Sequence, residues 1–484
     1  MTSANKDFTV DVVIIGAGPV GENVADRVVQ GGLSATIVER ELVGGECSYW
    51  ACMPTKALLR DPTALRAARA LPGAAGALTG DLDVAAVLAR RDRFTSGWDD
   101  AGQVEWLDGA GVTLVRGQGR LTETKTVTVT DNDGATTVLH ARHAVVIATG
   151  SSAKLPPIPG LAEVTPWTSR DAASAQSVPD RLAIIGGGVV GSEMATAYSS
   201  FGAQVTLISR SRLLPSVEPF ASEHLTEALR AAGATVYLDT GVTAAERDSA
   251  GTVHLTLSDG QVVAADEVLV ATGRTPNTKD LGLEHVGLTP GEWLPVDDAL
   301  TVVADGTPVD GGWLFAAGDV NKRALLTHHG KYQARALGDA IAARAGGAKL
   351  DLGVWGRHAA TADDRAVTQV IFTDPEVAAV GLTAEAATAA GIETRVVDQD
   401  LGAVAGAALH ADNYRGHARM VVDAERNVLV GFTAVGPDVA ELLHAATIAV
   451  VGEVPLDRLW HAVPAYPTIS EIWLRLLEAD GRDH

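Results

Sequence analysis

Residues 11–21 read DVVIIGAGPVG, and residues 181–191 read RLAIIGGGVVG. Each stretch runs from a short apolar segment into a Gly-x-Gly-x-x-Gly turn, and a helical stretch follows. Each then returns to a second apolar segment, at residues 35–38 and 205–208. This order of strand, glycine turn, helix and strand is the first half of a nucleotide-binding βαβ unit. Because the whole pattern occurs twice, the sequence predicts two nucleotide-binding units.

The three glycines of each motif have separate tasks. The first permits a tight turn, the second lets a pyrophosphate approach the backbone, and the third lets helix and strand pack closely. The phosphates then lie at the N-terminus of the helix. The predicted nucleotide contacts are therefore Gly16, Gly18 and Gly21 in the first unit, and Gly186, Gly188 and Gly191 in the second.

A second repeat indicates how each unit is completed. Residues 145–150 read VVIATG and residues 268–273 read VLVATG, and each follows a region of alternating strand-type residues, at 127–130 and 253–257. We therefore expect a β-meander before the last strand of each nucleotide-binding unit.

Changes in composition mark the domain boundaries. Prolines at 156, 157 and 159 indicate a linker, and the glycines at 346 and 347 indicate a second boundary. Beyond about residue 351 strand-like and helical runs alternate, at 367–372, 384–390, 418–422, 428–435 and 440–451. The expected fold class is α/β, with two Rossmann-like nucleotide-binding domains and a C-terminal α+β domain. The predicted ranges are 1–155 with 281–350, 156–280, and 351–484.

Composition excludes several classes of protein. The chain has 484 residues, a formal net charge of -22 and two cysteines. Two cysteines cannot form a disulfide-rich secreted framework, and a chain of this length can bury a large core without one. The excess of carboxylates argues against binding to nucleic acid or to anionic lipid. Since no signal peptide or membrane span is visible, we expect a soluble, cytoplasmic protein.

The two nucleotide sites differ at the end of their second strand. Glu39 lies 23 residues after Gly16, and Ser209 lies 23 residues after Gly186. A carboxylate at this place accepts hydrogen bonds from a ribose 2′-hydroxyl, so the first site suits FAD. The second site lacks a carboxylate and continues with Arg210 and Arg212, whose guanidiniums suit the 2′-phosphate of NADPH. The alternative is that both arginines are solvated and the site takes NADH.

Both cysteines lie in residues 44–56, which read GGECSYWACMPTK. A close Cys pair in a cytosolic chain is more often catalytic or metal-binding than structural. Metal binding needs more soft ligands than this chain offers, so no metal is predicted. The spacing of Cys47 and Cys52 suits a pair near one helical turn, where a helix N-terminus and Lys56 would lower a thiol pKa. The alternative is a pair of buried, inert thiols.

With these motifs the chain resembles the class I pyridine nucleotide–disulfide oxidoreductases. That family includes dihydrolipoamide dehydrogenase, glutathione reductase, mercuric reductase and the soluble transhydrogenases. The resemblance covers essentially the whole chain and includes four further motifs: GRTPN at 273–277, LFAAGD at 314–319, FTDPE at 372–376 and PTISE at 467–471. It implies an FAD-binding domain (1–155 and 281–350), an NAD(P)H-binding domain (156–280) and a dimerisation domain (351–484). It also implies a homodimer whose active sites are completed across the interface.

The resemblance assigns roles to individual residues. Cys52 would be the flavin-proximal thiol, which forms a charge-transfer complex, and Cys47 the interchange thiol that attacks the substrate. Lys56 would lie near flavin N5 and pair with Glu193, and Asp319 would hydrogen-bond the ribityl chain. The remaining expected cofactor contacts are Gly45, Gly119, Thr149, Gly150, Ser151, Gly273 and Thr327.

The sequence departs from the family pattern at one catalytic position. The disulfide reductases have a histidine directly before Pro-Thr-x-Ser-Glu, whereas this chain has Tyr466, with Glu471 retained. A tyrosine can donate a proton but is a poor base at neutral pH. His461 is a candidate substitute. Tyr466 and Trp50 resemble the transhydrogenases and some quinone-reducing relatives, which lack the complete Cys pair.

The expected activity is electron transfer from NAD(P)H through flavin and the Cys47–Cys52 disulfide to a small acceptor, such as a low-molecular-weight disulfide. The absence of further thiols disfavours protein disulfides and tight handling of Hg(II). The alternative activity passes electrons directly from reduced flavin to a quinone, a dye, oxygen or another nicotinamide nucleotide. A third interpretation is a non-catalytic flavoprotein subunit of a larger complex.

Overall fold

The computed structural model describes residues 6–482, which divide into two compact units. The first unit contains residues up to Met53 together with 92–152 and 274–364. The second contains residues 54–91, 153–273 and those from 365 onward. These two units do not coincide with the three domains predicted from the sequence, so the three domain ranges stay a prediction.

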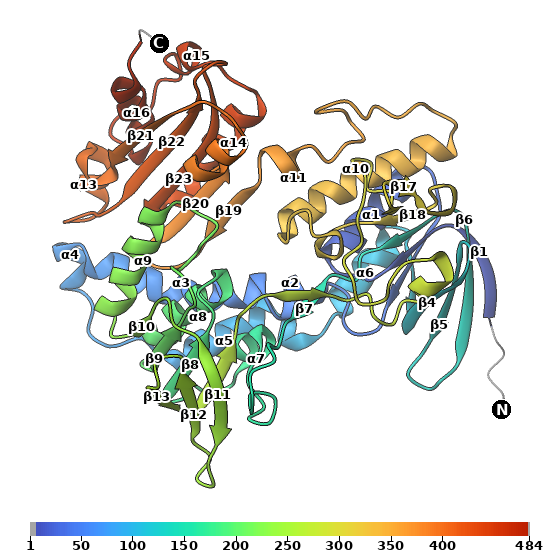
Figure 1. The fold of residues 1–484 in the computed structure, drawn as a ribbon, viewed down its shortest axis with the longest axis horizontal. Helices are drawn as coiled ribbons and strands as arrows, with labels where there is room; N and C mark the ends of the chain where they lie inside the picture. Colours follow the sequence, from blue (N-terminus) through green and yellow to red (C-terminus); the bar gives the residue numbers. More distant parts are fainter. Residues whose placement is uncertain (1–5, 483–484) are drawn as a thin grey trace. The chain divides into compact units, whose positions relative to one another are not determined.

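The first unit is built on one mixed sheet, seven-stranded within the described residues (Figure 1). Its strands follow the order β3 (Thr113–Arg116), β2 (Ala35–Glu39), β1 (Lys6–Ile15), β6 (Thr136–Ile147), β5 (Thr126–Thr130) and β4 (Gln118–Glu123), and β18 (Leu314–Ala316) also pairs with β6. The pairs of β1 with β2 and β6, and of β18 with β6, are parallel, while β4, β5 and β6 are antiparallel. The predicted β-meander is therefore present and extends the nucleotide-binding sheet.

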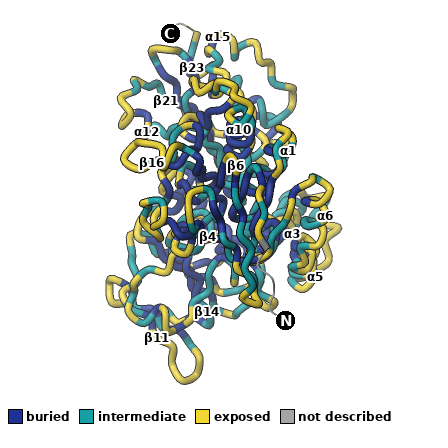
Figure 2. Tube along the Cα trace, turned by 90° about the vertical axis from the view of Figure 1, so that its right-hand side faces the viewer, coloured by how far each residue is buried: buried dark blue, intermediate teal, exposed yellow. Residues whose placement is uncertain are grey.

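Apolar side chains cover both faces of this sheet. Val12, Ile14 and Ile37 pack with α1 (Pro19–Gln30) and α10 (Thr327–Ala345) on one face. On the other face, Val13 and Val38 belong to a second buried cluster. Burial on both faces is typical of parallel strands, whose sequences read as continuous apolar runs. In Figure 2, β6 is buried over its last residues, 144–147, and only partly buried before them.

The second unit contains the second nucleotide-binding fold. A parallel sheet has the order β10 (Thr235–Tyr237), β9 (Gln204–Ile208), β8 (Arg181–Ile185) and β14 (Glu267–Val270). The second predicted β-meander forms a separate antiparallel sheet of β11 (Val242–Arg247), β12 (Val253–Leu257) and β13 (Val262–Ala265). The main helices of this nucleotide-binding fold are α8 (Val189–Ser200) and α9 (Pro219–Ala231).

The two sequence repeats have the same backbone hydrogen bonds. Gly16 N–H donates to Val38 O at 2.8 Å, and Gly186 N–H donates to Ile208 O at 2.8 Å. After the closing strands, Ala148 N–H donates to Ile15 O and Ala271 N–H to Ile185 O, both at 2.8 Å. Each Gly-rich turn is thus fixed between three parallel strands, which explains why the sequence pattern recurs.

The C-terminal part of the second unit is α+β, as expected. Its antiparallel sheet has the order β19 (Thr368–Ile371), β20 (Glu376–Gly381), β23 (Val428–Gly436), β22 (His417–Asp423) and β21 (Thr394–Asp400). The helices are α12 (Ala384–Ala389), α13 (Ala405–His410), α14 (Leu443–Val451), α15 (Leu456–Leu459) and α16 (Ile472–Asp480). The sequence patterns did not predict β20, β21 or α16.

The remaining elements complete the chain. They are α2 (Gly45–Tyr49), α3 (Cys52–Arg69), α4 (Pro72–Ala75), α5 (Val84–Phe94), α6 (Ala101–Gly109), β7 (Ser151–Ala153), α7 (Ser169–Ser174), β15 (Arg274–Pro276), β16 (Val303–Ala304), β17 (Thr307–Pro308) and α11 (Ala362–Arg365). Short 3-10 turns are η1 (Ser96–Trp98), η2 (Leu283–Val286), η3 (Val309–Gly311), η4 (Asp319–Asn321), η5 (Leu401–Ala403), η6 (Val439–Leu442) and η7 (Ile469–Glu471). Among the helices between residues 6 and 482, none is both long and apolar enough to cross a bilayer.

Candidate active site

The first glycine turn has the geometry that a pyrophosphate requires. Gly16 has φ +105°, and a Cβ atom added there would lie 2.5 Å from Ala148 O. A Cβ at Gly21 would lie 1.9 Å from Gly16 O, so helix α1 approaches the turn too closely for any side chain. A Cβ at Gly18 would meet no heavy atom within 4 Å. The second glycine therefore faces outward at the start of α1, where a phosphate binds.

Glu39 fixes this turn from the end of β2. Its Oε2 accepts a hydrogen bond from Ala17 N–H at 2.7 Å, and its Oε1 accepts one from Glu41 N–H at 2.8 Å. The carboxylate is thus held beside the glycine turn, where a ribose 2′-hydroxyl would donate to it.

The redox loop packs directly on the glycine turn. Gly44 N–H donates to Ala17 O at 2.8 Å. Gly45 has φ +55°, and a Cβ atom there would lie 2.8 Å from Gly18 Cα. Only glycine allows this approach, and it fixes the loop that carries Cys47 to the predicted FAD site.

The two cysteines lie on separate helices. Cys47 is in α2, which ends at Tyr49, and Cys52 begins α3. The prediction of a pair within one helical turn region is wrong in this detail, since the chain leaves the helix between the two cysteines. Cys52 Sγ lies 3.3 Å from Thr327 Oγ1, at the first residue of α10.

Both cysteines are free thiols, and they interact with each other. A hydrogen bond to the Cys52 side chain raises the pKa of Cys47, and burial and the charge on Cys52 raise it further. A hydrogen bond with Thr327 and the charge of Lys331 act in the opposite direction. The expectation of a lowered thiol pKa is therefore wrong for Cys47 in the reduced pair, because two adjacent, half-buried thiols do not both ionise readily.

A second group of predicted residues lies at the carboxyl end of β6. Ser151 Oγ donates to Asp319 Oδ2, and Arg274 donates through Nε to Ser151 Oγ and through Nη2 to Ser151 O. Asn277 Nδ2 donates to Thr149 O at 2.9 Å, and Asn277 N–H donates to Gly150 O at 3.0 Å. The motif at 273–277 thus positions the motif at 149–151.

Two observations at this end of the sheet fit a bound cofactor. Thr149 Oγ1 is buried without a hydrogen-bond partner within the described residues. A Cβ atom at Gly150 would meet no heavy atom within 4 Å. A buried hydroxyl without a partner is costly unless a ligand satisfies it. These residues therefore fit FAD. Gly119 has a different environment, because a Cβ there would lie 3.1 Å from Val38 Cγ1, inside the core.

The second glycine turn repeats the geometry of the first. Gly186 has φ +121° and lies against Ala271 O. A Cβ atom at Gly191 would lie 1.9 Å from Gly186 O. A Cβ atom at Gly188 or at Gly273 would meet no heavy atom within 4 Å. Ser209 is buried at the end of β9. This turn also fits a dinucleotide.

The two arginines after Ser209 are not equivalent. Arg212 Nη2 donates to Pro215 O and to Val217 O, each at 3.0 Å, so its guanidinium holds its own loop. Within residues 6–482, the Arg210 side chain donates no such hydrogen bond to the loop. Sequence spacing suggested that both arginines bind a 2′-phosphate, whereas the geometry leaves Arg210 as the candidate.

Lys56 forms the expected ion pair with Glu193. Lys56 Nζ lies 2.9 Å from Glu193 Oε2 and 3.1 Å from Oε1. Glu193 is buried in α8, and its Oε1 also accepts a hydrogen bond from Phe372 N–H at 3.0 Å. The Lys56 ammonium lies 5.1 Å from the centre of the Phe372 ring. The ion pair therefore holds α3, α8 and the end of β19 together.

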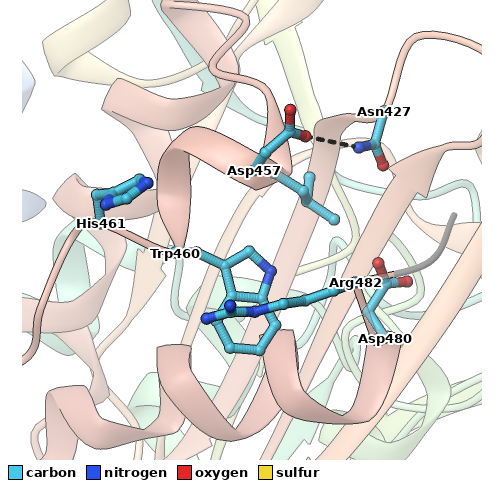
Figure 3. Close-up of a pocket in the computed structure, with 8 residues that line it drawn as sticks. Asn427, Asp457, Trp460, His461, Asp480 and Arg482 are labelled. Atoms are coloured by element: carbon cyan, nitrogen blue, oxygen red, sulfur yellow. Dashed lines mark hydrogen bonds between the residues drawn. The ribbon is translucent and has the colours of Figure 1, made fainter.

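The C-terminal candidates have contrasting environments. Tyr466 is 78% exposed, whereas Glu471 is 7% exposed and its Oε2 has no hydrogen-bond partner in the described chain. His461 instead lines a cavity of about 330 Å³ together with Asn427, Leu456, Asp457, Trp460, Asp480, Gly481 and Arg482 (Figure 3). In this cavity the Arg482 guanidinium lies 4.1 Å from the Trp460 ring centre, and Asn427 donates to Asp457. Neither Tyr466 nor Glu471 lines that cavity.

Sequence reasoning missed three residues of the first unit. Arg274, Lys331 and the buried Glu22 were not among the predicted site residues. Arg274 lies within the motif at 273–277, and Lys331 lies one helical turn after Thr327. The sequence therefore contained a signal for both residues. Glu22 directly follows Gly21, but its burial depends on tertiary packing.

Two dinucleotide-binding folds with a dithiol fixed beside the first define a flavin- and pyridine-nucleotide-dependent oxidoreductase. The chain belongs to the pyridine nucleotide-disulphide oxidoreductase family, whose pattern matches residues 10–335. The dimerisation domain of the same family matches residues 367–476. Members of this family bind FAD and a pyridine nucleotide.

Similarity to known proteins extends over nearly the whole chain. It is 31% identical to a mercuric reductase from Acidithiobacillus ferrooxidans over 97% of this chain and 82% of that protein. It is 32% identical to a dihydrolipoyl dehydrogenase from Chlorobaculum tepidum over 95% of each chain. Among solved structures, LpdA from Mycobacterium tuberculosis shares 25% identity and a TM-score of 0.79, covering 98% of this chain and 100% of that one.

Proposed function

We propose that this protein passes electrons from NADPH, through FAD and the Cys47–Cys52 pair, to a small acceptor. A low-molecular-weight disulfide is the acceptor class that the thiol pair suits best. The observation that carries the proposal is the position of the pair: Gly45 packs on Gly18 of the FAD turn, and Cys52 contacts Thr327 at the start of α10. A cytoplasmic location stays a prediction.

When bound, FAD supplies hydride acceptance at its N5 atom and two-electron delivery to a neighbouring disulfide. The residues of the chain then perform thiol exchange. Cys47 as thiolate attacks one sulfur of the acceptor disulfide, which releases the first acceptor thiol and leaves a mixed disulfide. Cys52 attacks Cys47 Sγ, releases the second acceptor thiol and restores the Cys47–Cys52 disulfide. Each turnover thus returns the pair to its oxidised form.

The surrounding residues position the cofactors. We assign the FAD to Gly16, Gly18, Gly21, Glu39, Gly45, Thr149, Gly150, Ser151, Asp319 and Thr327. Ser151 and Arg274 hold the Asp319 carboxylate, so that it can accept a hydrogen bond from the ribityl chain. Lys56, held by Glu193, supplies a positive charge for the flavin. A contact between Gly119 and FAD stays a prediction. Gly119 also packs closely against Val38 in the core.

For the nicotinamide nucleotide we propose NADPH. Gly186, Gly188 and Gly191 would bind its pyrophosphate, and Ser209 and Arg210 would bind its 2′-phosphate. Gly273 would lie at the edge of the site. Arg210 lies two residues after the end of β9, and no carboxylate stands at the end of this strand, which favours a phosphate over a free 2′-hydroxyl. NADH is the alternative.

We further propose a homodimer in which the second copy completes the active site. Residues 367–476 match the domain through which members of this family dimerise. Val463 is 85% exposed and Tyr466 is 78% exposed, and both lie before the buried Glu471. Exposed apolar and aromatic residues of this kind are typical of protein interfaces. Tyr466 of the partner subunit would then donate a proton to the leaving thiolate.

A second function is favoured by Tyr466 itself. A tyrosine in place of the histidine weakens acid–base catalysis at neutral pH. Electrons would then pass directly from reduced flavin to a quinone, a dye or a second nicotinamide nucleotide, without thiol exchange.

Anaerobic titration with NADPH, followed by turnover with a panel of disulfides and quinones, separates the two functions. Thiol chemistry predicts a long-wavelength absorbance band after two-electron reduction and a loss of disulfide turnover of at least about 100-fold in Cys47→Ser. Unchanged turnover of an acceptor in Cys47→Ser would exclude the thiol route for that acceptor. A Tyr466→His variant tests the acid–base role, since it should raise turnover of glutathione-type disulfides.

A further inference from the structure

Residues 96–98 form a strained turn in the first unit. Ser96, Gly97 and Trp98 have φ values of +51°, +60° and +60°. The left-handed conformation is unfavourable for residues with a side chain, and it rarely occurs at consecutive positions. Strain of this kind persists only where the surrounding structure fixes it, and it is concentrated at functional sites. The contacts of this turn therefore show which part of the molecule requires it.

The Trp98 side chain contacts the chain between the two cysteines. Its Nε1 donates a hydrogen bond to Tyr49 O at 3.1 Å. Tyr49 is the last residue of α2 and is 2% exposed, and its hydroxyl lies 3.5 Å from Asp99 O. Each of the two segments thus supplies a side chain that reaches the backbone of the other.

This hydrogen bond lies where the helix breaks. The last carbonyl groups of a helix have no partner inside the helix, and a buried carbonyl group needs one. Trp98 supplies the partner for Tyr49 O. Trp50 then leaves the helical conformation, with φ −135° and ψ −2°, and α3 begins at Cys52. The indole N–H therefore helps to fix the break that separates the two cysteines.

Two further contacts hold the same loop from the segment that follows the turn. Gln103 Nε2 donates to Ser48 Oγ at 3.2 Å. Asp100 Oδ2 accepts a hydrogen bond from Val43 N–H at 2.7 Å. Residues 98–103 thus contact the redox loop at three places between residues 43 and 49. The bond from Trp98 is the one of these that lies between the positions of the two cysteines.

We propose that Trp98 is a positioning residue for the dithiol: by fixing Tyr49 O it holds Cys47 and Cys52 where they readily form their disulfide. Two thiols that are held in place form a disulfide more readily than thiols on a loose loop, because the entropy of bringing them together has already been lost. Trp98 acts through the backbone of the loop. The inference rests on the proposed function of the two cysteines as a redox-active pair.

The test is the equilibrium between the pair and dithiothreitol in the holoenzyme. The protein is equilibrated anaerobically over a wide range of ratios of oxidised to reduced dithiothreitol, free thiols are alkylated, and each cysteine is measured by mass spectrometry. When the disulfide forms, the pair gives up two electrons and two protons, which oxidised dithiothreitol accepts. Trp98→Phe removes the N–H donor, and it should make the disulfide about tenfold easier to reduce, a rise in midpoint potential of about 30 mV.

A second variant separates the side chain from the strained backbone. Glycine suits a φ of +60°, so Trp98→Gly relieves the strain while it removes the indole, and it should raise the potential as Trp98→Phe does. Trp313→Phe is the matched control, because Trp313 Nε1 donates to Asp310 Oδ2 at the same 3.1 Å in the same unit. The potential of this control should equal that of the wild type.

The outcomes separate failure of the inference from failure of the proposed function. A potential that stays at the wild-type value or falls in Trp98→Phe would show that the inference is wrong. A rise of the same size in Trp313→Phe would show the same. If the wild-type pair forms no disulfide at any ratio of dithiothreitol, the proposed function fails and the inference fails with it. Only this last outcome is visible in the wild-type protein.

Discussion

At the scale of single residues, Gly45 connects the redox loop to the cofactor turn. Its φ of +55° lies in the left-handed region, and its α-carbon faces Gly18 Cα with no room for a methyl group. Two separate costs would follow from a side chain here: backbone strain and displacement of the loop.

Substitution of Gly45 therefore tests the connection between thiols and FAD. We expect Gly45→Ala to lower FAD content severalfold and to reduce the free energy of unfolding by about 2 kcal/mol, more than the roughly 1 kcal/mol of strain alone. Bound flavin is measured by absorbance and stability by urea unfolding. Gly134→Ala is the matched control, because Gly134 has φ +82° and open space around it. Equal effects of the two variants would contradict the close-approach interpretation.

We predict different effects for substitutions of Arg210 and Arg212, although the two residues lie close together in the sequence. Arg210→Ala should lower kcat/KM with NADPH by about 10- to 100-fold, the value of one to two charge-assisted hydrogen bonds, and should leave NADH unaffected. Arg212→Ala should lower the thermal stability of the loop without changing cofactor preference, because its guanidinium binds Pro215 O and Val217 O. Steady-state kinetics with both nucleotides checks this. A preference lost in Arg212→Ala and kept in Arg210→Ala would reverse the assignment.

At the scale of elements, Asp11 in the middle of β1 is tied to Ser34, the residue directly before β2. Ser34 N–H donates to Asp11 Oδ2 at 2.8 Å, Ser34 Oγ donates to the same oxygen at 2.7 Å, and Asp11 N–H donates to Ser34 Oγ at 3.0 Å. The backbone bond, the Ser34 hydroxyl and Arg142 lower the pKa of Asp11 from 3.8 to about 2.

This shift predicts a pH-dependent contribution to stability. Because the folded-state pKa lies below the ordinary value, the stabilisation is complete above about pH 4 and is lost as the pH falls toward 2. Asp11→Asn should therefore cost about 1 kcal/mol at pH 7, and the difference from wild type should shrink below pH 4. Urea unfolding at several pH values measures it. A difference that is constant down to pH 2 would show that ionisation of Asp11 plays no part.

The elements also show what sequence alone can predict. The glycine turns were predictable because backbone conformation and close approach leave no other residue type possible. The strands β20 and β21 were missed because β20 reads EVAAVG, with alanine and glycine that are poor strand formers, and β21 carries polar residues such as Asp398 and Gln399. The helix break between Cys47 and Cys52 was not visible in their spacing. The orientation of Arg212 depends on loop carbonyls, and the burial of Glu22 depends on α10, so neither could be read from local sequence.

At the scale of the whole molecule, the C-terminal domain predicts a dimer. We expect a mass of twice the 50.0 kDa chain by light scattering. Val463→Asp places a charge on a side chain that is 85% exposed in the single chain, so it should weaken association at least tenfold with little effect on the fold. Leu155→Asp, at an exposed position of the first linker, is the comparison. A Val463→Asp protein that remains fully dimeric would place the interface elsewhere.

The central claim is that electrons leave the flavin through Cys47 and Cys52, and counting thiols tests it most directly. Holoenzyme is alkylated anaerobically before and after one equivalent of NADPH, and each cysteine is measured by mass spectrometry. We predict no modification of the oxidised enzyme and modification of both Cys47 and Cys52 after reduction, with protection restored on adding the disulfide acceptor. Cysteines that stay unmodified in NADPH-reduced enzyme, while the acceptor is still reduced at full rate, would contradict the claim.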